Sequence, residues 1–312
     1  MKKSNLTVTI GIPVYNEERN ITYLIKSILK QEQGSYALEK IIVISDGSSD
    51  STKDIVQKLA INYPIINLLA DGKRLGKQKR LLQLYKINTS DIVIQLDGDM
   101  ILSSPKVIAK LVKGFLNKKI VAVGGNMQPV IAESFFEKIA NWWFKIWYEV
   151  RRDLNDGDSI NNVLSSILAL DAKFAKKLKL NPKIFTTGQF IYCLIKQKKL
   201  LFHYADGAII YFRMPTNLSE YLIQTNRSSS ERKQLAQVFG TWIYELYTIP
   251  KDVKLRILCK NLLSNPFYTI SAGLFFLYLR FIPFKQQEEN TQGLWKIIPS
   301  TKSGLYKVFE NI

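Results

Sequence analysis

The N-terminal third of the chain alternates between short buried strands and amphipathic helices, and this alternation limits the chain to few folds. Near-continuous apolar runs occupy residues 7–14, 40–45 and 92–96, and helix-like patterns follow the first two at residues 20–31 and 51–60. Strands that are apolar on both faces are typical of parallel sheets with helices on each side. The sequence therefore predicts an α/β fold with a mostly parallel central sheet flanked by helices.

Polar residues follow three of these strands, in the runs Pro13–Glu17, Asp46–Asp50 and Asp97–Asp99. Ligands of such sheets bind outside the carboxyl ends of the strands, so we expect the three runs to converge on one site. The two acids around Gly98 suit Mg²⁺ or Mn²⁺, which take one or two carboxylates plus substrate phosphates. A plain Asp-Gly turn is the alternative. No GxGxxG follows the first strand and no GxxxxGK[ST] is present, which disfavours dinucleotide-binding and P-loop folds.

The chain is strongly basic, with 44 Lys and Arg against 26 Asp and Glu in 312 residues and a formal charge of +18. This excess indicates an anionic partner: nucleic acid, an anionic membrane surface or a phosphate-bearing substrate. Many lysines decorate helices as ordinary solvated residues, which disfavours nucleic acid. Cys193, Cys259 and the single His203 match no metal or redox spacing. The N-terminus lacks the apolar stretch of a signal peptide, so we expect the catalytic part in the cytoplasm.

Two later segments are candidates for membrane contact. Residues 135–152 crowd aromatic side chains onto an expected helix that ends in two arginines, which suits either a membrane interface or packing on the sheet. Residues 262–284 are almost free of charge, and with Pro266 they suit a spanning, interfacial or kinked helix, or a buried one. We expect a domain at residues 1–245 and a helical, membrane-associating region at residues 246–312.

With these runs and the Gly76-Lys77 pair in order, the sequence resembles the family-two inverting glycosyltransferases of the GT-A fold over residues 7–240. The resemblance implies metal-dependent transfer of a sugar from a nucleotide diphosphate, with UDP expected, to a lipid-linked or glycan acceptor at the membrane. It implies Asp99 and Asp97 as metal ligands. The nucleotide-binding residues that it implies are Pro13, Tyr15, Glu17, Asp46, Ser48, Arg74, Lys77, Asp97, Gln224 and Arg227.

Three of these positions have an evident chemistry. An Asp at the place of Asp46 can accept the imide N–H of uracil. The guanidinium of Arg227 can fork onto phosphate oxygens, although Ser228 replaces the Trp that usually follows this Arg in the family. The positive charges of Lys77 and the nearby Arg74 offset the negative charge of a diphosphate.

One departure from the family concerns the catalytic base. The family has a carboxylate in the stretch that matches Thr187–Phe190, and this chain has Gln189, which cannot take a proton from a hydroxyl. The base then comes from elsewhere, with Asp171, Asp156 and Asp158 as candidates, or the acceptor is already an anion such as a polyprenyl phosphate. The third alternative is a non-catalytic module that binds a nucleotide sugar. If the chain is a transferase, the residues expected at its catalytic centre are Asp97, Asp99 and Arg227, with Gln189 at the position of the family's base.

Overall fold

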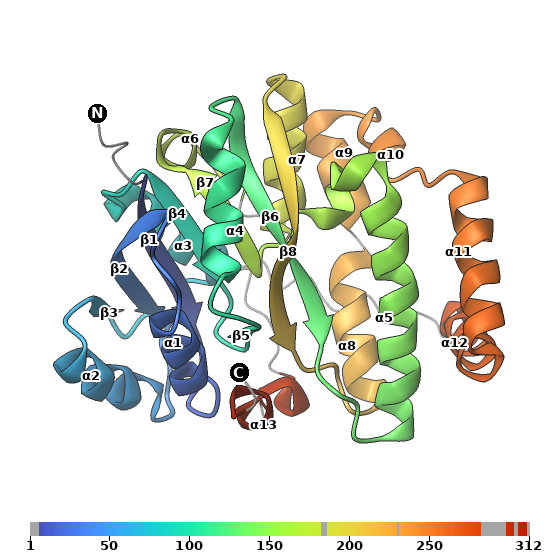
Figure 1. Ribbon diagram of the computed structural model, residues 1–312, viewed down its shortest axis with the longest axis horizontal. Helices are drawn as coiled ribbons and strands as arrows, with labels where there is room; N and C mark the ends of the chain where they lie inside the picture. Colours follow the sequence, from blue (N-terminus) through green and yellow to red (C-terminus); the bar gives the residue numbers. More distant parts are fainter. Residues whose placement is uncertain (1–5, 182–185, 230, 282–297, 303–304, 311–312) are drawn as a thin grey trace.

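The computed structural model describes residues 6–181, 186–229, 231–281, 298–302 and 305–310, without the side chains of residues 226–229 and 280. A sheet of eight strands runs through this part of the chain in the order β3-β2-β1-β4-β7-β6-β8-β5 (Figure 1). The strands are β1 (Leu6–Val14), β2 (Tyr36–Ser45), β3 (Ile66–Ala70), β4 (Ile92–Leu96), β5 (Ile101–Leu102), β6 (Ile120–Pro129), β7 (Ile167–Asp171) and β8 (Leu201–Phe212).

The sheet is mostly parallel, as predicted. β1 lies parallel to β2 and β4, β2 to β3, and β6 to β8. β7 is the central exception, because it is antiparallel to both β4 and β6, and β5 is antiparallel to β8. Since Leu96 pairs with Ile167, β7 starts at the edge where β4 ends. The antiparallel strand therefore brings the residues before it to the same edge as the predicted acidic pair.

Helices cover both faces of the sheet. The described α-helices are α1 (Ile21–Leu29), α2 (Thr52–Asn62), α3 (Lys77–Ile87), α4 (Val107–Lys113), α5 (Phe135–Asp153), α6 (Ala172–Lys176), α7 (Thr187–Gln197), α8 (Leu218–Ser229), α9 (Glu231–Phe239), α10 (Ile243–Leu246), α11 (Lys251–Ser264), α12 (Pro266–Phe281) and α13 (Tyr306–Phe309). Short 3₁₀ turns are η1 (Gly114–Leu116), η2 (Asn155–Gly157), η3 (Ile160–Asn162) and η4 (Pro299–Lys302).

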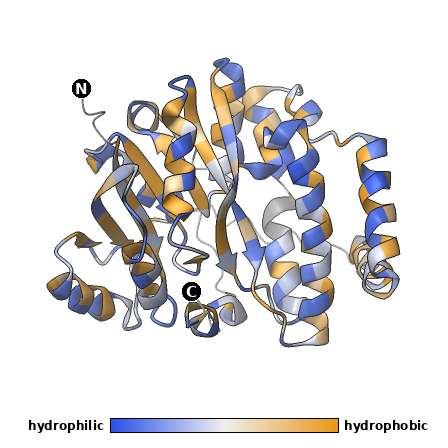
Figure 2. Cartoon of the chain, in the orientation of Figure 1, coloured by the Kyte–Doolittle hydropathy of each residue, from blue (hydrophilic) through white to orange (hydrophobic). Residues whose placement is uncertain are grey.

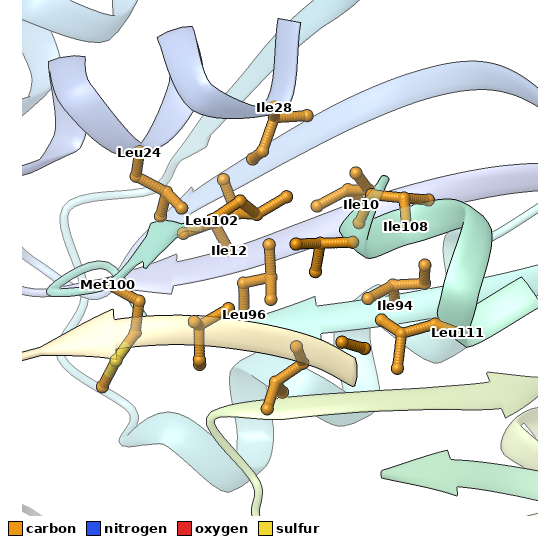
Figure 3. Close-up of a cluster of buried hydrophobic side chains, with 14 of the residues drawn as sticks. Ile10, Ile12, Leu24, Ile28, Ile94, Leu96, Met100, Leu102, Ile108 and Leu111 are labelled. Carbon is orange, nitrogen blue, oxygen red and sulfur yellow. The ribbon is translucent and has the colours of Figure 1, made fainter. Parts of the chain in front are cut away.

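Alternate residues of the strands enter two separate cores. From β4, Ile94 and Leu96 join a cluster with α1 and α4, shown in Figure 3, whereas Val93 joins a cluster with α3, α6 and α7 on the other face. Figure 2 accordingly shows the central strands as predominantly hydrophobic. Burial on both faces explains the apolar runs of the sequence. It also makes the strand ends rigid supports for the polar residues that follow them.

The aromatic helix α5 packs within the protein. A capping box formed by Ser134 and Glu137 starts it. Trp143 stacks on Phe276 of α12 with ring centroids 3.8 Å apart, and the indole N–H of Trp142 donates to Thr269 at 3.0 Å. Phe144 of α5 packs on Phe212 of β8, with ring centroids 5.1 Å apart, so the structure shows the packing on the sheet that was one alternative for residues 135–152.

The apolar segment at residues 262–284 is divided between two helices. It comprises the last turn of α11 and all of α12, with a break at Asn265 and with Pro266 at the first position of α12, where its missing N–H has no helical partner to lose. Residues 282–284 lie outside the described part. None of the described helices combines the length and the apolar character needed to cross a membrane. The division of the chain at residue 245 stays a prediction.

Candidate active site

The acidic pair lies at the end of β4, and Asp97 contacts groups from α3 and from the segment before β7. The Asp97 carboxylate forms an ion pair with Lys77, at the start of α3, and accepts a hydrogen bond from the Ser166 hydroxyl at 2.7 Å. The Lys77 ammonium also donates to the Ser165 hydroxyl at 3.2 Å. Asp97 is thus tied to α3 on one side and to the segment before β7 on the other.

Glu17, which follows β1, reaches the same place from the neighbouring strand. Asn16 adopts a left-handed conformation with φ of 54°, and the Glu17 N–H donates to the Thr52 hydroxyl at 2.8 Å, so the turn holds the Glu17 side chain inward. A Cβ at Gly98 would lie 2.8 Å from Cγ of Glu17. Only glycine therefore fits between the two acids of the pair, because the Glu17 side chain passes over it.

Glu17, Asp97 and Asp99 together form an acidic cluster, and the positive charge beside it only partly compensates for them. Burial and, after it, the charge of Asp99 raise the pKa of Glu17 to about 8, and the ammonium of Lys302 opposes the rise. Burial also raises the pKa of Asp99; Lys302 again opposes the rise, while Asp97 adds to it. Bringing carboxylates together with so little compensation is unfavourable unless a cation joins them.

The donor set fits Mg²⁺ or Mn²⁺. Among the described residues, no group of three or more His, Cys, Asp or Glu side chains is arranged so that it could hold a metal ion by itself. These hard cations commonly bind through only one or two carboxylates and complete their shell with substrate phosphates and water. Asp99 and Asp97 provide that number of carboxylates, and both side chains are partly exposed.

Asp46, at the end of β2, organises the loop before α3. Its carboxylate accepts from the Leu75 N–H at 2.7 Å, from the Gly76 N–H at 3.0 Å and from Nε of Arg80 at 2.9 Å. The Arg80 guanidinium is buried and also binds the Asp71 carboxylate. The structure thus shows a supporting role for Asp46, and its contact with a nucleobase stays a prediction.

The remaining residues expected to bind the nucleotide lie at the same edge. The Arg74 guanidinium stacks on the Tyr15 ring, 3.4 Å from its centroid. Ser48 accepts the Asn16 N–H at 3.2 Å, and Pro13 is half-buried in β1, paired with Ile44 of β2. The first two strand ends and the loop before α3 therefore contact one another, and their binding of a nucleotide stays a prediction.

Helix α8 carries the other two predicted residues. The amide oxygen of Gln224 is buried without a hydrogen-bond partner among the described residues, and its contact with a nucleotide stays a prediction. Arg227 lies three residues further along α8, and its side chain is outside the described residues. Its contact with a diphosphate stays a prediction.

Gln189 lies in the first turn of α7, near the acidic pair. A Cβ at Gly188 would collide with the Val163 carbonyl oxygen and approach the Ser165 N–H to 3.2 Å, so this end of α7 is pressed against the segment before β7. Ser165 in turn contacts Lys77. The start of α7 therefore packs on the segment that contacts Lys77, and the role of Gln189 stays a prediction.

The structure does not bring the three alternative bases to this site. Asp171 pairs with Ile92, at the opposite end of β4 from Asp97, and its side chain caps α6. Asp158 is held by Lys196 at 2.7 Å and by Tyr192, beyond the first turn of α7. Asp156 is an exposed residue of η2, and within the described part of the chain it has no contact with Asp97 or Lys77. Asp171 is the clearest correction, because an antiparallel β7 reverses the edge at which its carboxylate lies.

Comparison with known proteins shows the family to which the chain belongs. Residues 9–178 match the family described as Glycosyl transferase family 2. The chain belongs to that family. Its matched part contains both strand-end acids of β4, Glu17, Asp46 and Lys77, and it ends before α7.

Two curated relatives of this family 2 chain are named for transfer to lipid carriers. It is 27% identical over 142 residues to the bactoprenol glucosyl transferase of Shigella phage SfX, covering 45% of this chain and 46% of that protein. It is 30% identical over 140 residues to the dolichol-phosphate mannosyltransferase of Pyrococcus furiosus, covering 45% of this chain and 37% of that protein. The matches therefore span less than half of each relative.

Solved structures confirm the GT-A fold. A mannosyltransferase from Pyrobaculum calidifontis, in complex with GDP-mannose and Mn²⁺, superposes with a TM-score of 0.59 at 16% identity, covering 90% of this chain and 76% of the other. Glucosyl-3-phosphoglycerate synthase from Mycobacterium tuberculosis, in complex with Mn²⁺ and UDP, superposes with a TM-score of 0.51 at 19% identity, covering 75% of this chain and 80% of the other. At these identities the likeness concerns the fold alone.

Three residues of the site were not expected from the sequence. Ser165 and Ser166 precede an antiparallel strand that the alternation did not predict, so nothing placed them beside Asp97. Lys302 lies outside both the matched residues and the family resemblance, and its sequence surroundings carry no chemical signature.

Proposed function

We propose that this chain is an inverting glycosyltransferase that moves a sugar from a nucleotide diphosphate, with UDP preferred, to a lipid-linked phosphate at a membrane. The convergence of Asp97 and Asp99 with Lys77 and Glu17 at one sheet edge carries the proposal, because this edge offers carboxylates for a cation beside an ammonium group for phosphate. Membership of family 2 and the names of the lipid-carrier relatives support it.

Each side of the site has a distinct task in this proposal. Tyr15 and Arg74 offer a stacked, cationic surface to the nucleoside, and Asp46 holds the loop that carries Arg74. Lys77, with Arg227 from α8, binds the diphosphate. Asp99 and Asp97 would hold Mg²⁺ or Mn²⁺, which neutralises the charge that develops on the leaving diphosphate.

The acceptor side favours an anion. Gln189 stands at the start of α7, where the family has its carboxylate; Asp171 lies at the opposite end of β4 from Asp97, and Asp158 is engaged by Lys196 and Tyr192. A hydroxyl acceptor would forgo the contribution of a general base, about 10²–10⁴ in rate. A phosphate acceptor arrives ionised and needs no base, so Gln189 is compatible with transfer to a polyprenyl phosphate.

Transfer assays test this proposal directly. Purified protein is incubated with Mn²⁺, with a panel of UDP- and GDP-sugars, and with polyprenyl phosphate, a neutral glycolipid or an oligosaccharide. We expect product only with the lipid phosphate. Donor that binds without transfer to any acceptor would favour the non-catalytic module, which the missing carboxylate supports. Efficient transfer to a neutral hydroxyl would overturn the anionic acceptor.

A carboxylate restored at the base position should not help. We expect Gln189→Asp to transfer sugar to polyprenyl phosphate about 10-fold more slowly than the parent, since a negative charge beside an anionic acceptor repels it. Gln189→Asn is the matched control, because it shortens the side chain equally without adding charge. Faster transfer by Gln189→Asp than by Gln189→Asn would contradict the proposal.

Helices α11 and α12 are the proposed contact with the membrane. They lie at one end of the molecule (Figure 1), and they expose large apolar side chains: Leu255, Leu258, Leu262, Leu263, Phe267, Ile270, Leu274, Leu277, Tyr278 and Phe281. α11 also exposes cations, among them Lys254 and Arg256. Apolar side chains beside cations suit the surface of an anionic bilayer.

Acidic substitutions in these helices should weaken membrane binding. Leu263 is 87% and Leu274 is 62% exposed, and inserting a leucine into an apolar phase is worth about 1.5–3 kcal/mol. We expect Leu263→Asp with Leu274→Asp to reduce binding to phosphatidylglycerol vesicles more than 10-fold in co-sedimentation. Ile61→Asp, at an equally exposed residue of α2, is the control and should bind as the parent does. Equal losses in both variants would point to charge alone.

A further inference from the structure

The C-terminal tail, residues 298–302 and 305–310 of the described chain, lies against the edge of the sheet that carries the site. Leu305 is fully buried in a cluster with Ile101 of β5 and Val130. On the next turn Phe309 packs against Tyr23 of α1, with ring centroids 5.6 Å apart. Figure 1 shows α13 at this lower edge of the molecule. The tail is therefore a packed part of the fold and belongs to the site edge.

The tail is also attached to the far side of the site. The Thr216 N–H, at the end of β8, donates to the Ser300 hydroxyl at 3.2 Å, and Ser300 also bonds to Glu220 of α8. Lys307 forms an ion pair of 2.6 Å with Glu133, which precedes α5. The tail therefore bridges α1 and β5 to α8, which carries the predicted diphosphate ligands.

Between these two attachments, Lys302 enters the acidic cluster. Its ammonium forms an ion pair with Glu17, and its side chain is 21% exposed. Asp99 and Asp97 both act on it electrostatically. The cluster thus contains three carboxylates and two ammonium groups, Lys77 on the Asp97 side and Lys302 on the Glu17 and Asp99 side.

The two ammonium groups differ in how they are placed. Lys77 starts a helix and is bonded to Ser165 and Asp97, so it belongs to the rigid framework. Lys302 ends a single 3₁₀ turn, and its bond to the cluster is with Glu17. Of the two, Lys302 is therefore the one that can leave with a small rearrangement of the tail.

We propose that Lys302 is a tethered counter-ion of the acidic cluster, and that a divalent cation must displace its ammonium to bind Asp99. This inference rests on the proposed function, because it assumes the cation site at Asp99 and Asp97. The Lys302 ammonium is bonded to Glu17 and is attracted by Asp99 and Asp97, so it and a divalent cation on Asp99 and Asp97 repel each other within one cluster and cannot both occupy it at full strength. Lys302 thereby weakens cation binding and couples it to the position of the tail.

A removal of the ammonium should strengthen cation binding even without nucleotide. We expect Lys302→Met to bind Mn²⁺ at least 10-fold more tightly than the parent, measured by calorimetry or by the electron paramagnetic resonance signal of free Mn²⁺. Lys302→Gln should behave in the same way, because it retains a hydrogen-bond donor for Glu17 and loses only the charge. Lys307→Met is the matched control, since it removes one charge from the same tail away from the cluster, and it should bind Mn²⁺ as the parent does.

The outcomes separate this inference from the proposed function. If the parent binds Mn²⁺ and loses that binding with Asp99→Asn, yet Lys302→Met and Lys302→Gln bind no more tightly, the displacement is refuted and the cation site stands. Equal tightening by Lys307→Met would refute it too, because the effect would then be one of net charge. If no variant binds Mn²⁺ with or without UDP, both the displacement and the cation site are refuted, and sugar transfer in EDTA then shows whether the transferase activity stands without them.

Discussion

Asp99→Asn is expected to abolish the effect of Mn²⁺ on UDP binding and to lower sugar transfer about 1,000-fold, because a bound cation contributes several kcal/mol to stabilising a leaving diphosphate. The fold should survive the change. Burial, and after it Asp97, raise the pKa of Asp99 in the folded protein, so at pH 7, above the pKa of an aspartate in the unfolded chain, this carboxyl lowers the free energy of unfolding. A neutral amide removes that cost, and the melting temperature should stay equal or rise.

Calorimetric titration of UDP with and without Mn²⁺ measures this prediction. The control is Asp91→Asn, the same substitution at the opposite end of β4, where the carboxylate accepts the Thr7 N–H at 3.0 Å. It should leave the dependence on Mn²⁺ intact. A dependence that persists in Asp99→Asn would place the cation elsewhere, and a large fall in melting temperature would mean that the carboxylate supports the fold.

The sequence predicts those parts of the fold that depend on local pattern. Strands β1, β2 and β4 are apolar on both faces, and this pattern alone indicates a buried parallel sheet. The pattern does not reveal the antiparallel direction of β7, because a short buried strand has the same composition in either direction. Because β7 is antiparallel, Ser166 at its start lies beside Asp97, whereas Asp171 at its end lies at the opposite edge of the sheet.

The site is predicted to the extent that it lies at strand ends. Asp46, Asp97 and Asp99 each follow a buried strand closely, so the sheet itself brings them to one edge. Lys302 reaches the same edge through the packing of Leu305 and Phe309 on distant elements. Such long-range packing leaves no local pattern, and a lysine in a polar stretch is indistinguishable from a solvated one.

One buried arginine joins two carboxylates at this edge. Arg80 is 1% exposed, and its guanidinium joins Asp46 at the end of β2 to Asp71 in the loop before α3. Removal of one partner of a buried pair leaves the other charge without compensation and costs about 3–5 kcal/mol. We therefore expect Arg80→Met to lower the free energy of unfolding by about that amount in urea titrations, and to weaken UDP binding, because the loop carries Arg74.

A double substitution distinguishes the lost pair from lost packing. If the cost of Arg80→Met comes from an uncompensated Asp46 carboxylate, then adding Asp46→Asn should recover part of it, and the double variant should be more stable than Arg80→Met alone. If it comes from the shape of the side chain, the second change should add a further loss. Arg19→Met, at an exposed arginine, should change the free energy of unfolding by no more than about 0.5 kcal/mol. UDP binding should stay weak in the double variant. The loop before α3 is ordered by the Asp46 carboxylate and by the Arg80 guanidinium, and the double variant lacks both.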